Sequence, residues 1–460
     1  MINDTIAAIV TAMGAASVGI IRISGPDAIK IGNLVYDGKR DFIKTPSHSI
    51  LYGKVYDQFN KKIIDEALFL IMKEPSTFSG EDIVEIQCHG GIIPVRKVLE
   101  LVLRNGARIA EPGEFSKRAF LNGKLDLAQA ESIMDIVNAK TEKGLEVAIN
   151  QLQGGLSLLV NEVRYELLRL VAFIEADIDF PDDDIERLNS TQQLEKLIVQ
   201  RDKLINILLT AQKGKILREG LNVIIIGKPN VGKSSLLNAL LRENKAIVTD
   251  IPGTTRDAIE EYINLGGIPI KLVDTAGIRE SENLVEQIGI EKAKEFITKA
   301  DLILYVLDII EGISDDDKKI ILQLLNKVPT LFLANKVDLQ YNQEKVKAIK
   351  NVLGEKELIL ISAKESQGLE AIEERIAALF FEGSLQVSGE SIVTSTRHVQ
   401  ALQIAYDHLK GAINSIQNDL PGDFVVIDIR SSWEHLGKIT GDTIEDDILD
   451  QIFSQFCLGK

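Results

Sequence analysis

The chain has little cysteine and no long hydrophobic run, and both shortages exclude classes of protein. Only two cysteines occur in 460 residues, Cys88 and Cys457, which excludes a disulfide-stapled scaffold and suits a reducing cytoplasm. The apolar run 302–310 is interrupted by Asp308 and is too short to span a bilayer. No lysine or arginine precedes Arg22, so we expect no signal or transit peptide. Histidine and cysteine nowhere cluster with metal-ligand spacing, so zinc is not expected.

Positive charge is also scarce. Lysine and arginine number 52 against 68 acidic residues, a net charge of −16. A protein that coats nucleic acid nonspecifically needs a wide basic surface, so this composition argues against one. Any RNA contact must use a local patch or be shared with a partner. The length predicts about two to four domains at roughly 100–200 residues each.

What the chain does contain is a phosphate-binding pattern. Residues 227–234 read GKPNVGKS, which fits G-x-x-x-x-G-K-[ST]. A buried-strand pattern at 222–226 precedes it and a helical pattern follows it, the context that such a loop requires. Lys233 can reach the β- and γ-phosphates of a nucleotide, and the Ser234 hydroxyl can bind Mg²⁺. The predicted nucleotide contacts here are Asn230, Val231, Gly232, Lys233, Ser234 and Ser235.

Three later segments identify the nucleotide as GTP, and each follows a predicted strand. Asp338 in the first of them can accept two hydrogen bonds from the N1–H and exocyclic amine of guanine, a pair that adenine lacks. Ligands bind at the carboxyl ends of strands in open α/β sheets, so the three segments should converge. The segments are Asn335-Lys336-Val337-Asp338, Ser362-Ala363-Lys364 and Asp274-Thr275-Ala276-Gly277.

The polar loop at 249–257, which precedes Asp274-Thr275-Ala276-Gly277, is predicted to complete the site. One of its threonines, with Thr255 favoured, should bind Mg²⁺. The alternative is that the loop is a plain surface turn. The predicted contacts in the loop are Thr249, Asp250, Ile251, Pro252, Gly253, Thr254 and Thr255. Many GTPases follow the DTAG glycine with a glutamine that orients water, but here Ile278 stands there. Either the protein hydrolyses GTP poorly or another group takes over this role. Glu280, Glu282 and Glu286 are the candidates, and residue chemistry alone does not rank them.

The chain reads as four regions. Residues 1–118 combine strand patterns at 17–24, 48–56, 66–73 and 81–88 with a helix from Ile92. Long helices are predicted within 119–215 and again within 382–460, at 394–417 and 441–456. Between them, 216–381 alternates strand and helix, which predicts a doubly wound α/β domain with a largely parallel sheet. We therefore expect a multidomain α+β and α/β protein, with one discontinuous helical domain into which the nucleotide domain is inserted.

Further motifs make the whole chain resemble the TrmE or MnmE family of tRNA-modification GTPases. The motifs outside the nucleotide site are VGIIRISG (18–25), SGEDIVEIQCHGG (79–91), EPGEFSKRAFLNGKLDLAQAE (111–131), DFPDDDI (179–185) and the terminal FCLGK (456–460). The resemblance implies a folate-binding N-terminal domain, a helical domain of two chain segments and an inserted Ras-like P-loop GTPase domain.

The same resemblance implies partners and a cation. Such proteins are homodimers that join an FAD-dependent GidA or MnmG protein in a heterotetramer, and together they build an aminomethyl or carboxymethylaminomethyl group at C5 of the wobble uridine of certain tRNAs. Their GTPase domains pair when K⁺ binds, and pairing activates hydrolysis. The matching K⁺ ligands are Asn230, Thr249, Ile251 and Thr254, and the catalytic glutamate falls on Glu286.

The resemblance also implies a site for 5-formyltetrahydrofolate or a related tetrahydrofolate. The family's folate contacts match Arg22, Glu85 and Lys124 of this sequence. Lys460 joins them, because the C-terminal tail points toward the folate pocket in the family. Cys457 beside it either attacks a uracil ring as a thiolate or is a small apolar residue of the tail. We expect Cys88 to be buried in a strand, His89 to be structural, and residues 182–184 to begin a helix rather than bind a metal.

Two alternative functions use the same nucleotide motifs. One is a ribosome-assembly GTPase, which the acidic composition disfavours. The other is a folate-dependent enzyme in which GTP only controls assembly. Mass spectrometry of the wobble uridine in tRNA from a deletion strain tests the tRNA-modification hypothesis against them: unmodified uridine supports that hypothesis, and normal modification removes it.

Overall fold

The protein is described by a computed structural model over residues 4–180, 188–243, 261–272, 300–324, 328–381 and 392–460. The chain forms two compact units. One unit comprises Met1–Met134, Gln151–Gln200 and Ile404–Lys460, and the other Asp135–Asn150 and Arg201–Gln403. In the ranges given above, no helix is both long and apolar enough to cross a lipid bilayer.

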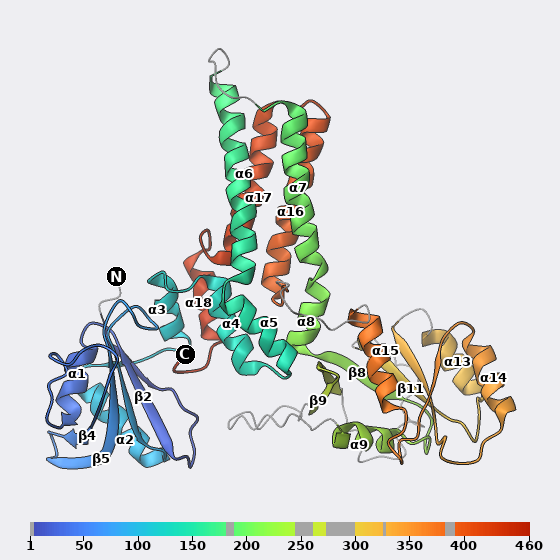
Figure 1. Ribbon diagram of the computed structural model, residues 1–460, viewed down its shortest axis with the longest axis horizontal. Coiled ribbons are helices and arrows are strands. Elements are labelled where there is room, and N and C mark those ends of the chain that lie inside the picture. Colours follow the sequence, from blue (N-terminus) through green and yellow to red (C-terminus); the bar gives the residue numbers. More distant parts are fainter. Residues whose placement is uncertain (1–3, 181–187, 244–260, 273–299, 325–327, 382–391) are drawn as a thin grey trace. The chain divides into compact units, whose positions relative to one another are not determined.

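The first unit contains a 7-stranded sheet with one face covered by two helices (Figure 1). The helices α1 (Ala28–Val35) and α2 (Ile92–Arg104) pack on alternate strand residues, such as Ile21 and Ile23, which are fully buried. Neighbouring strands are antiparallel except β1 and β7, which are parallel. The four predicted strands and the helix from Ile92 are confirmed. The strands are β1 (Ile6–Ile9), β2 (Val18–Ser24), β3 (Tyr36–Asp37), β4 (Ser49–Asp57), β5 (Lys62–Met72), β6 (Ile83–His89) and β7 (Arg108–Ile109), ordered β3-β4-β5-β6-β2-β1-β7.

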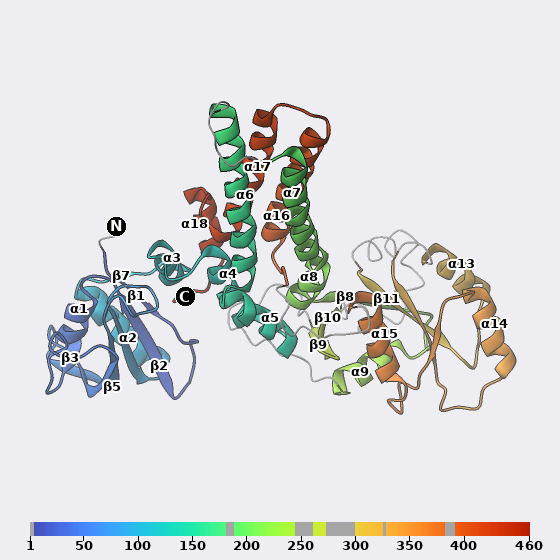
Figure 2. The same ribbon diagram turned by 45° about the horizontal axis from the view of Figure 1, so that its top comes forward.

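Helices, several of them long, make up most of the rest of the first unit. The helix α6 (Gly155–Asp179) packs lengthwise against α17 (Gly422–Thr440), as both views show (Figures 1 and 2). Buried residues of α6 recur every three or four positions, which gives a helix one apolar face. The helices predicted within 119–215, at 394–417 and at 441–456 are confirmed, whereas α17 was not predicted. The others with residues here are α3 (Glu114–Leu121), α4 (Leu127–Asn138), α5 (Glu142–Leu152), α7 (Ser190–Leu209), α16 (Thr396–Gln417) and α18 (Asp446–Ser454).

The C-terminal tail of the chain packs on the N-terminal sheet and on α3. The backbone N–H of Phe115 donates to the carbonyl oxygen of Lys460 at 3.1 Å. Gly459 has φ +90°, and a Cβ there would lie 2.7 Å from the carbonyl oxygen of Ile9. Glycine is therefore the residue that this close approach permits.

The second unit contains a 6-stranded sheet, and all of its neighbouring strands are parallel except β9 and β10. This confirms the largely parallel sheet and the five strands predicted for it. The antiparallel strand β9 was not predicted. The strands are β8 (Leu221–Ile226), β9 (Glu261–Leu265), β10 (Ile268–Leu272), β11 (Leu302–Asp308), β12 (Thr330–Asn335) and β13 (Leu358–Leu360), ordered β13-β12-β11-β8-β10-β9.

Helices cover both faces of this sheet, as a doubly wound fold requires. Alternate residues of β11 separate into two apolar clusters: Leu304 packs with α9 and α15, whereas Tyr305 packs with α13 and α14. Figure 1 shows α13 and α14 beside each other. The helices of this unit are α8 (Ala211–Glu219), α9 (Lys233–Glu243), α13 (Asp315–Leu324), α14 (Gln343–Leu353) and α15 (Leu369–Phe381).

Two glycines close the hairpin between β9 and β10. Gly266 and Gly267 have φ +58° and +91°, which suits a two-residue turn. The register pairs Leu272 with Glu261. The core of this unit also takes in Val147 of α5 and Ile216 of α8, outside the range 216–381 or at its edge. The boundaries predicted after residues 118, 215 and 381 remain predictions.

Candidate nucleotide site

The predicted phosphate loop lies between β8 and α9, at the carboxyl edge of the parallel sheet. Its two pattern glycines are sterically required. A Cβ on Gly227 would lie 2.4 Å from the carbonyl oxygen of Val306, and one on Gly232 would lie 2.1 Å from Nδ2 of Asn335. Gly232 also has φ +101°. The loop is therefore a tight backbone cradle of the kind that admits phosphate groups.

Lys233 begins α9 and its ammonium group stays at the loop. Its Nζ donates to the carbonyl oxygens of Gly227, at 2.8 Å, and Lys228, at 2.6 Å. Burial lowers the pKa of Lys233 below the ordinary lysine value. Ser234 and Ser235 are exposed in the first turn of α9, where free backbone N–H groups and the helix dipole attract anions.

Asn335 at the end of β12 joins two of the predicted segments. Its Nδ2 donates to the carbonyl oxygen of Val231 at 2.8 Å, and its Oδ1 accepts from the backbone N–H of Ala363 at 2.9 Å. Asn335 is 3% exposed, so both groups need these partners. One side chain thus fixes the phosphate loop relative to the 362–364 segment.

Asp338 and Ser362 form a second link. The Ser362 hydroxyl donates to Oδ1 of Asp338 at 2.6 Å, and this hydrogen bond holds the pKa of Asp338 below its ordinary value. The Asp338 side chain is exposed, so the second carboxylate oxygen is accessible to a base. Lys336, at φ +74°, donates to Oδ2 of Asp308 at 2.6 Å. Lys364 is exposed.

Three of the predicted segments thus converge: 230–235, 335–338 and 362–364. The structure does not describe the others, so their roles remain predictions. Outside the described residues lie Thr249, Asp250, Ile251, Pro252, Gly253, Thr254, Thr255, Asp274, Thr275, Ala276, Gly277, Ile278, Glu280, Glu282 and Glu286, and also the predicted helix start at 182–184.

Within the part of the chain that the structure describes, no group of three or more histidine, cysteine, aspartate or glutamate side chains has a metal-binding arrangement. The Ser234 hydroxyl, next to Lys233 and exposed, fits a Mg²⁺ ion held mainly by water and phosphate oxygens. Asn230 is exposed at φ +62° and offers an amide oxygen at the rim of the loop, which fits a K⁺ ligand.

Sequence reasoning missed Asp308 and Asp317. Asp308 ends β11 and pairs with Lys336; its position at the carboxyl end of a strand was a usable signal. Asp317 lies in α13 and comes within 3.4 Å of Nζ of Lys228. A cluster of three consecutive aspartates gave no indication that one of them is buried.

The predicted folate residues lie in the first unit. Arg22 on β2 and Glu85 on β6 are register partners, and Nε of Arg22 donates to Oε1 of Glu85 at 2.7 Å. The Arg22 guanidinium lies 5.5 Å from the ring centroid of Phe115 and 5.7 Å from that of Phe78. Lys460 reaches the same neighbourhood, because its carbonyl oxygen accepts from the N–H of Phe115.

The other predicted residues of this unit make contacts of their own. Lys124 donates from Nζ to the carbonyl oxygen of Pro75 at 3.0 Å, and Cys457 is an exposed free thiol. Cys88 is buried, as predicted, and burial raises the pKa of its thiol to about 11. His89 is exposed and pairs with Asp65 at 2.7 Å.

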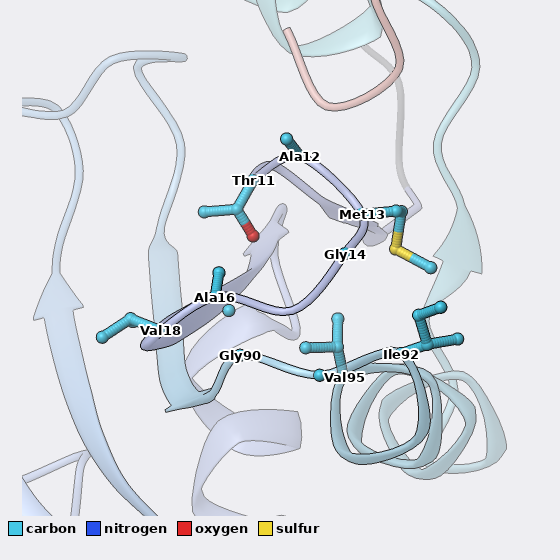
Figure 3. A pocket seen from close by; sticks show the side chains of 11 residues that line it. Thr11, Ala12, Met13, Gly14, Ala16, Val18, Gly90, Ile92 and Val95 are labelled. Atoms are coloured by element: carbon cyan, nitrogen blue, oxygen red, sulfur yellow. The ribbon is translucent and has the colours of Figure 1, made fainter. Parts of the chain in front are cut away.

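A small pocket opens elsewhere on this unit (Figure 3). The loop after β1, including Thr11 and Met13, faces Ile92 and Val95 of α2 across it. Its lining is apolar apart from Thr11, whose Oγ1 accepts from the N–H of Ile20. The pocket is lined by none of the predicted folate residues.

Comparisons with known proteins cover the whole chain. The family description "GTP-binding protein TrmE N-terminus" matches residues 5–124, and "MnmE helical domain" matches residues 127–457. The "tRNA modification GTPase MnmE" of Desulforamulus reducens is 51% identical over 465 residues, and that of Alkaliphilus oremlandii is 49% identical over 461, each covering 100% of both chains. The protein of the same name from Bacillus licheniformis is 46% identical over 99% of this chain and 100% of its own.

Among solved structures, Aquifex aeolicus Era bound to GDP·AlF₄⁻ is 28% identical over 41% of this chain and 66% of its own. The TM-score is 0.27, so this partial likeness adds nothing to the matches along the whole chain.

Proposed function

The chain belongs to the MnmE family of tRNA modification GTPases, and from that premise we propose its reaction. The protein hydrolyses GTP in tRNA modification. With an FAD-dependent partner of the GidA or MnmG type, it forms an aminomethyl or carboxymethylaminomethyl group at C5 of the wobble uridine. Hydrolysis depends on K⁺ and follows pairing of two GTPase domains within a homodimer.

The observation that carries the GTPase proposal is the double link made by Asn335. Its side chain joins the phosphate loop at Val231 to the 362–364 segment at Ala363. Together with the hydrogen bond from Ser362 to Asp338, this link supports a common site for Asp338 and the loop. The Asp338 carboxylate, kept ionised by the Ser362 hydroxyl, is suited to accept the N1–H and amine hydrogens of guanine.

Phosphate binding falls to the loop and to the start of α9. The backbone N–H groups of the loop and the Lys233 ammonium neutralise phosphate oxygens, and they do so best where charge grows during phosphoryl transfer. Ser234 and Thr255 would hold Mg²⁺, which would neutralise negative charge on the phosphate groups. Ser234 supports this role through its exposure beside Lys233.

We assign the water-orienting role to Glu286. The residues that would bind K⁺ are Asn230, Thr249, Ile251 and Thr254. Ile278 has no group that polarises water, so we assign that role to a residue beyond it. K⁺ supplies positive charge near the phosphates when bound. Asn230 supports that assignment, because its left-handed backbone at the loop rim leaves the side-chain amide exposed.

Folate binding is the finer part of the proposal. Arg22, Glu85, Lys124 and Lys460 would hold a tetrahydrofolate such as 5-formyltetrahydrofolate. The contact of Arg22 with Phe115, and of Phe115 with the carbonyl of Lys460, supports a shared pocket for Arg22 and the tail. Glu85 would grip the donor face of a pterin with its carboxylate. Cys457, exposed in the same tail, stays a candidate for the modification chemistry.

The test uses a bacterial strain that lacks its own family member. This chain should restore the modified wobble uridine, measured by mass spectrometry of digested tRNA. The Lys233→Ala variant should fail, whereas Lys347→Ala on the exposed face of α14 should succeed. Unmodified uridine with the wild-type chain would contradict the proposal. Hydrolysis of GTP in KCl against NaCl, and calorimetry with 5-formyltetrahydrofolate, test K⁺ and folate separately.

A further inference from the structure

The two ends of Lys228 make separate contacts. Lys228 is the second residue of the phosphate loop, and its carbonyl oxygen accepts from Nζ of Lys233 at 2.6 Å. Its own ammonium nitrogen lies 3.4 Å from Oδ2 of Asp317 in α13. The main chain of Lys228 therefore contacts the phosphate-binding lysine, while its side chain contacts a different helix.

The carboxylate of Asp317 is held firmly by its neighbours. Oδ2 accepts from the N–H of Ser314 at 3.0 Å and from its hydroxyl at 2.6 Å, and Oδ1 accepts from the hydroxyl of Tyr305 at 2.9 Å. Its side chain is 3% exposed. In return, the N–H of Asp317 donates to Oγ of Ser314 at 3.2 Å, which completes a capping box for α13.

These contacts fix both the position and the charge of the carboxylate. Burial by itself would raise the pKa of Asp317, but the hydrogen bonds from Ser314 and Tyr305 and the nearby charge of Lys228 more than offset it, so the pKa is lowered. An ionised carboxylate anchored on β11 and α13 thus faces the phosphate loop. An exposed ion pair contributes little, but here one partner is shielded from water and salt.

We propose that Lys228 is a positioning residue: Asp317 holds its side chain, and its carbonyl thereby aims Lys233 at the nucleotide phosphates. The inference rests on the proposed function only in taking Lys233 as a phosphate ligand. It adds α13 to the machinery of the site, through a contact that the phosphate-loop pattern leaves as a wildcard position. Misplacing a reacting group by about 1 Å can cost up to roughly 100-fold in rate, so a small shift of Lys233 matters.

Lys228 can be removed without uncapping the helix. In Lys228→Met, Asp317 keeps the three hydrogen bonds from Ser314 and Tyr305, so α13 and the fold should persist. Lys228→Arg keeps a cation that reaches Asp317. Lys318→Met is the matched control, since Lys318 lies on the same helix and pairs with the exposed Asp315.

The experiment is a double-mutant cycle on the full-length protein. Lys228→Met should weaken binding of a non-hydrolysable GTP analogue about fivefold and lower kcat for GTP about tenfold, while the protein remains folded. Lys228→Arg should recover most of both, and Lys318→Met should match the wild type. In a Lys233→Ala background, Lys228→Met should have no further effect, because the lysine that it positions is gone.

Two results would overturn the inference. One is wild-type analogue binding and kcat in Lys228→Met. The other is an equal loss in the Lys233→Ala background, which would mean that Lys228 acts independently of Lys233. If the wild-type chain binds the analogue but does not hydrolyse GTP, the proposed function fails instead, and the binding cycle still decides the role of Lys228.

Discussion

The side-chain amide of Asn335 donates to the carbonyl oxygen of Val231, 104 residues earlier in the chain, at 2.8 Å. The two residues come from segments for which we predict different tasks: Asn335 begins the segment 335–338 predicted to bind the base, and Val231 lies in the predicted phosphate loop. We therefore expect recognition of guanine and binding of phosphate to depend on each other, since a shift of either segment breaks a buried hydrogen bond.

Asn335→Ala should weaken GDP binding about 10- to 100-fold. It leaves the carbonyl of Val231 and the N–H of Ala363 buried without their partner, which costs about 1–3 kcal/mol each. Calorimetric titration with GDP measures the loss. Asn342→Ala is the control: Asn342 caps α14 by accepting from the N–H of Glu344, so its loss should cost about 1 kcal/mol of stability without altering affinity. Equal affinities for both variants would contradict the linking role.

Asp338→Asn should change the base preference from guanine to xanthine. The carboxylate matches the two donors of guanine, whereas an amide can donate to the second carbonyl group of xanthine. Competition of GDP and XDP for the site should reverse, with GDP affinity falling at least about 100-fold. Because the hydroxyl of Ser362 holds the pKa of Asp338 below its ordinary value, wild-type guanine preference should persist into mildly acidic buffer. Undiminished GDP binding by the variant would exclude Asp338 from base recognition.

Glu286→Ala should retain GTP affinity but lose most of the K⁺-stimulated turnover, about 100-fold or more for a group that orients the attacking water. Hydrolysis rates with KCl and with NaCl, at one ionic strength, measure this. Glu280→Ala and Glu282→Ala are matched controls from the same stretch of sequence. An unchanged rate in Glu286→Ala, or a comparable loss in one of the controls, would reassign the role.

Glu114→Gln should make the stability of the first unit less sensitive to acid. Burial alone would raise the pKa of Glu114, but hydrogen bonds from Arg108 and from the N–H of Glu111 hold it below its ordinary value. A lowered folded-state pKa contributes stability above the unfolded pKa of about 4.3, and this is lost as the pH falls below that value.

The variant should therefore be less stable at pH 7, by about 1–3 kcal/mol, and lose less than the wild type on acidification. Thermal midpoints between neutral pH and pH of about 3.5 test this across the ordinary carboxyl range. Glu100→Gln, on an exposed part of α2, provides the comparison and should follow the wild type. Parallel curves for wild type and Glu114→Gln would refute the expectation.

Gly459→Ala should displace the tail from the N-terminal sheet. The added Cβ meets the carbonyl oxygen of Ile9 at 2.7 Å, and φ is +90°, so steric overlap adds to backbone strain. Faster removal of the tail by carboxypeptidase, about tenfold, is the expected result. Gly106→Ala shares the positive φ, +111°, but has open space around the Cβ. Digestion of Gly459→Ala at the wild-type rate, or an equal increase in Gly106→Ala, would contradict the role of this close packing.

Local pattern predicted the central strands and the position of the phosphate loop, because buried parallel strands read as short apolar runs and the loop has a fixed spacing. The strand β9 was missed although Gly266-Gly267 is a recognisable hairpin turn. The helix α17 was missed because its first turns, with Val425, Val426 and Ile427, are β-branched residues that favour strands. Packing against α6 outweighs that preference.

Contacts between distant residues were beyond such reasoning. Nothing in the sequence distinguishes the burial of the three adjacent aspartates at 315–317. Only Asp317 is buried, because the helical turn directs it toward Tyr305. The pairing of Arg22 with Glu85 likewise follows from the register of β2 against β6, which neither strand specifies alone. Residue type and spacing located the candidates, and register and burial determined their partners.

The hairpin of β9 and β10 connects two stretches of chain that carry predicted nucleotide contacts. Residues 249–255 lead into β9, whose first residue is Glu261, and residues 274–277 follow β10, whose last residue is Leu272. Since Glu261 and Leu272 are paired in the antiparallel register, their Cα atoms are about 5 Å apart. Inserting a single residue into one strand would shift this register by one residue. The point where the chain enters β9 would then move along the sheet relative to the point where it leaves β10.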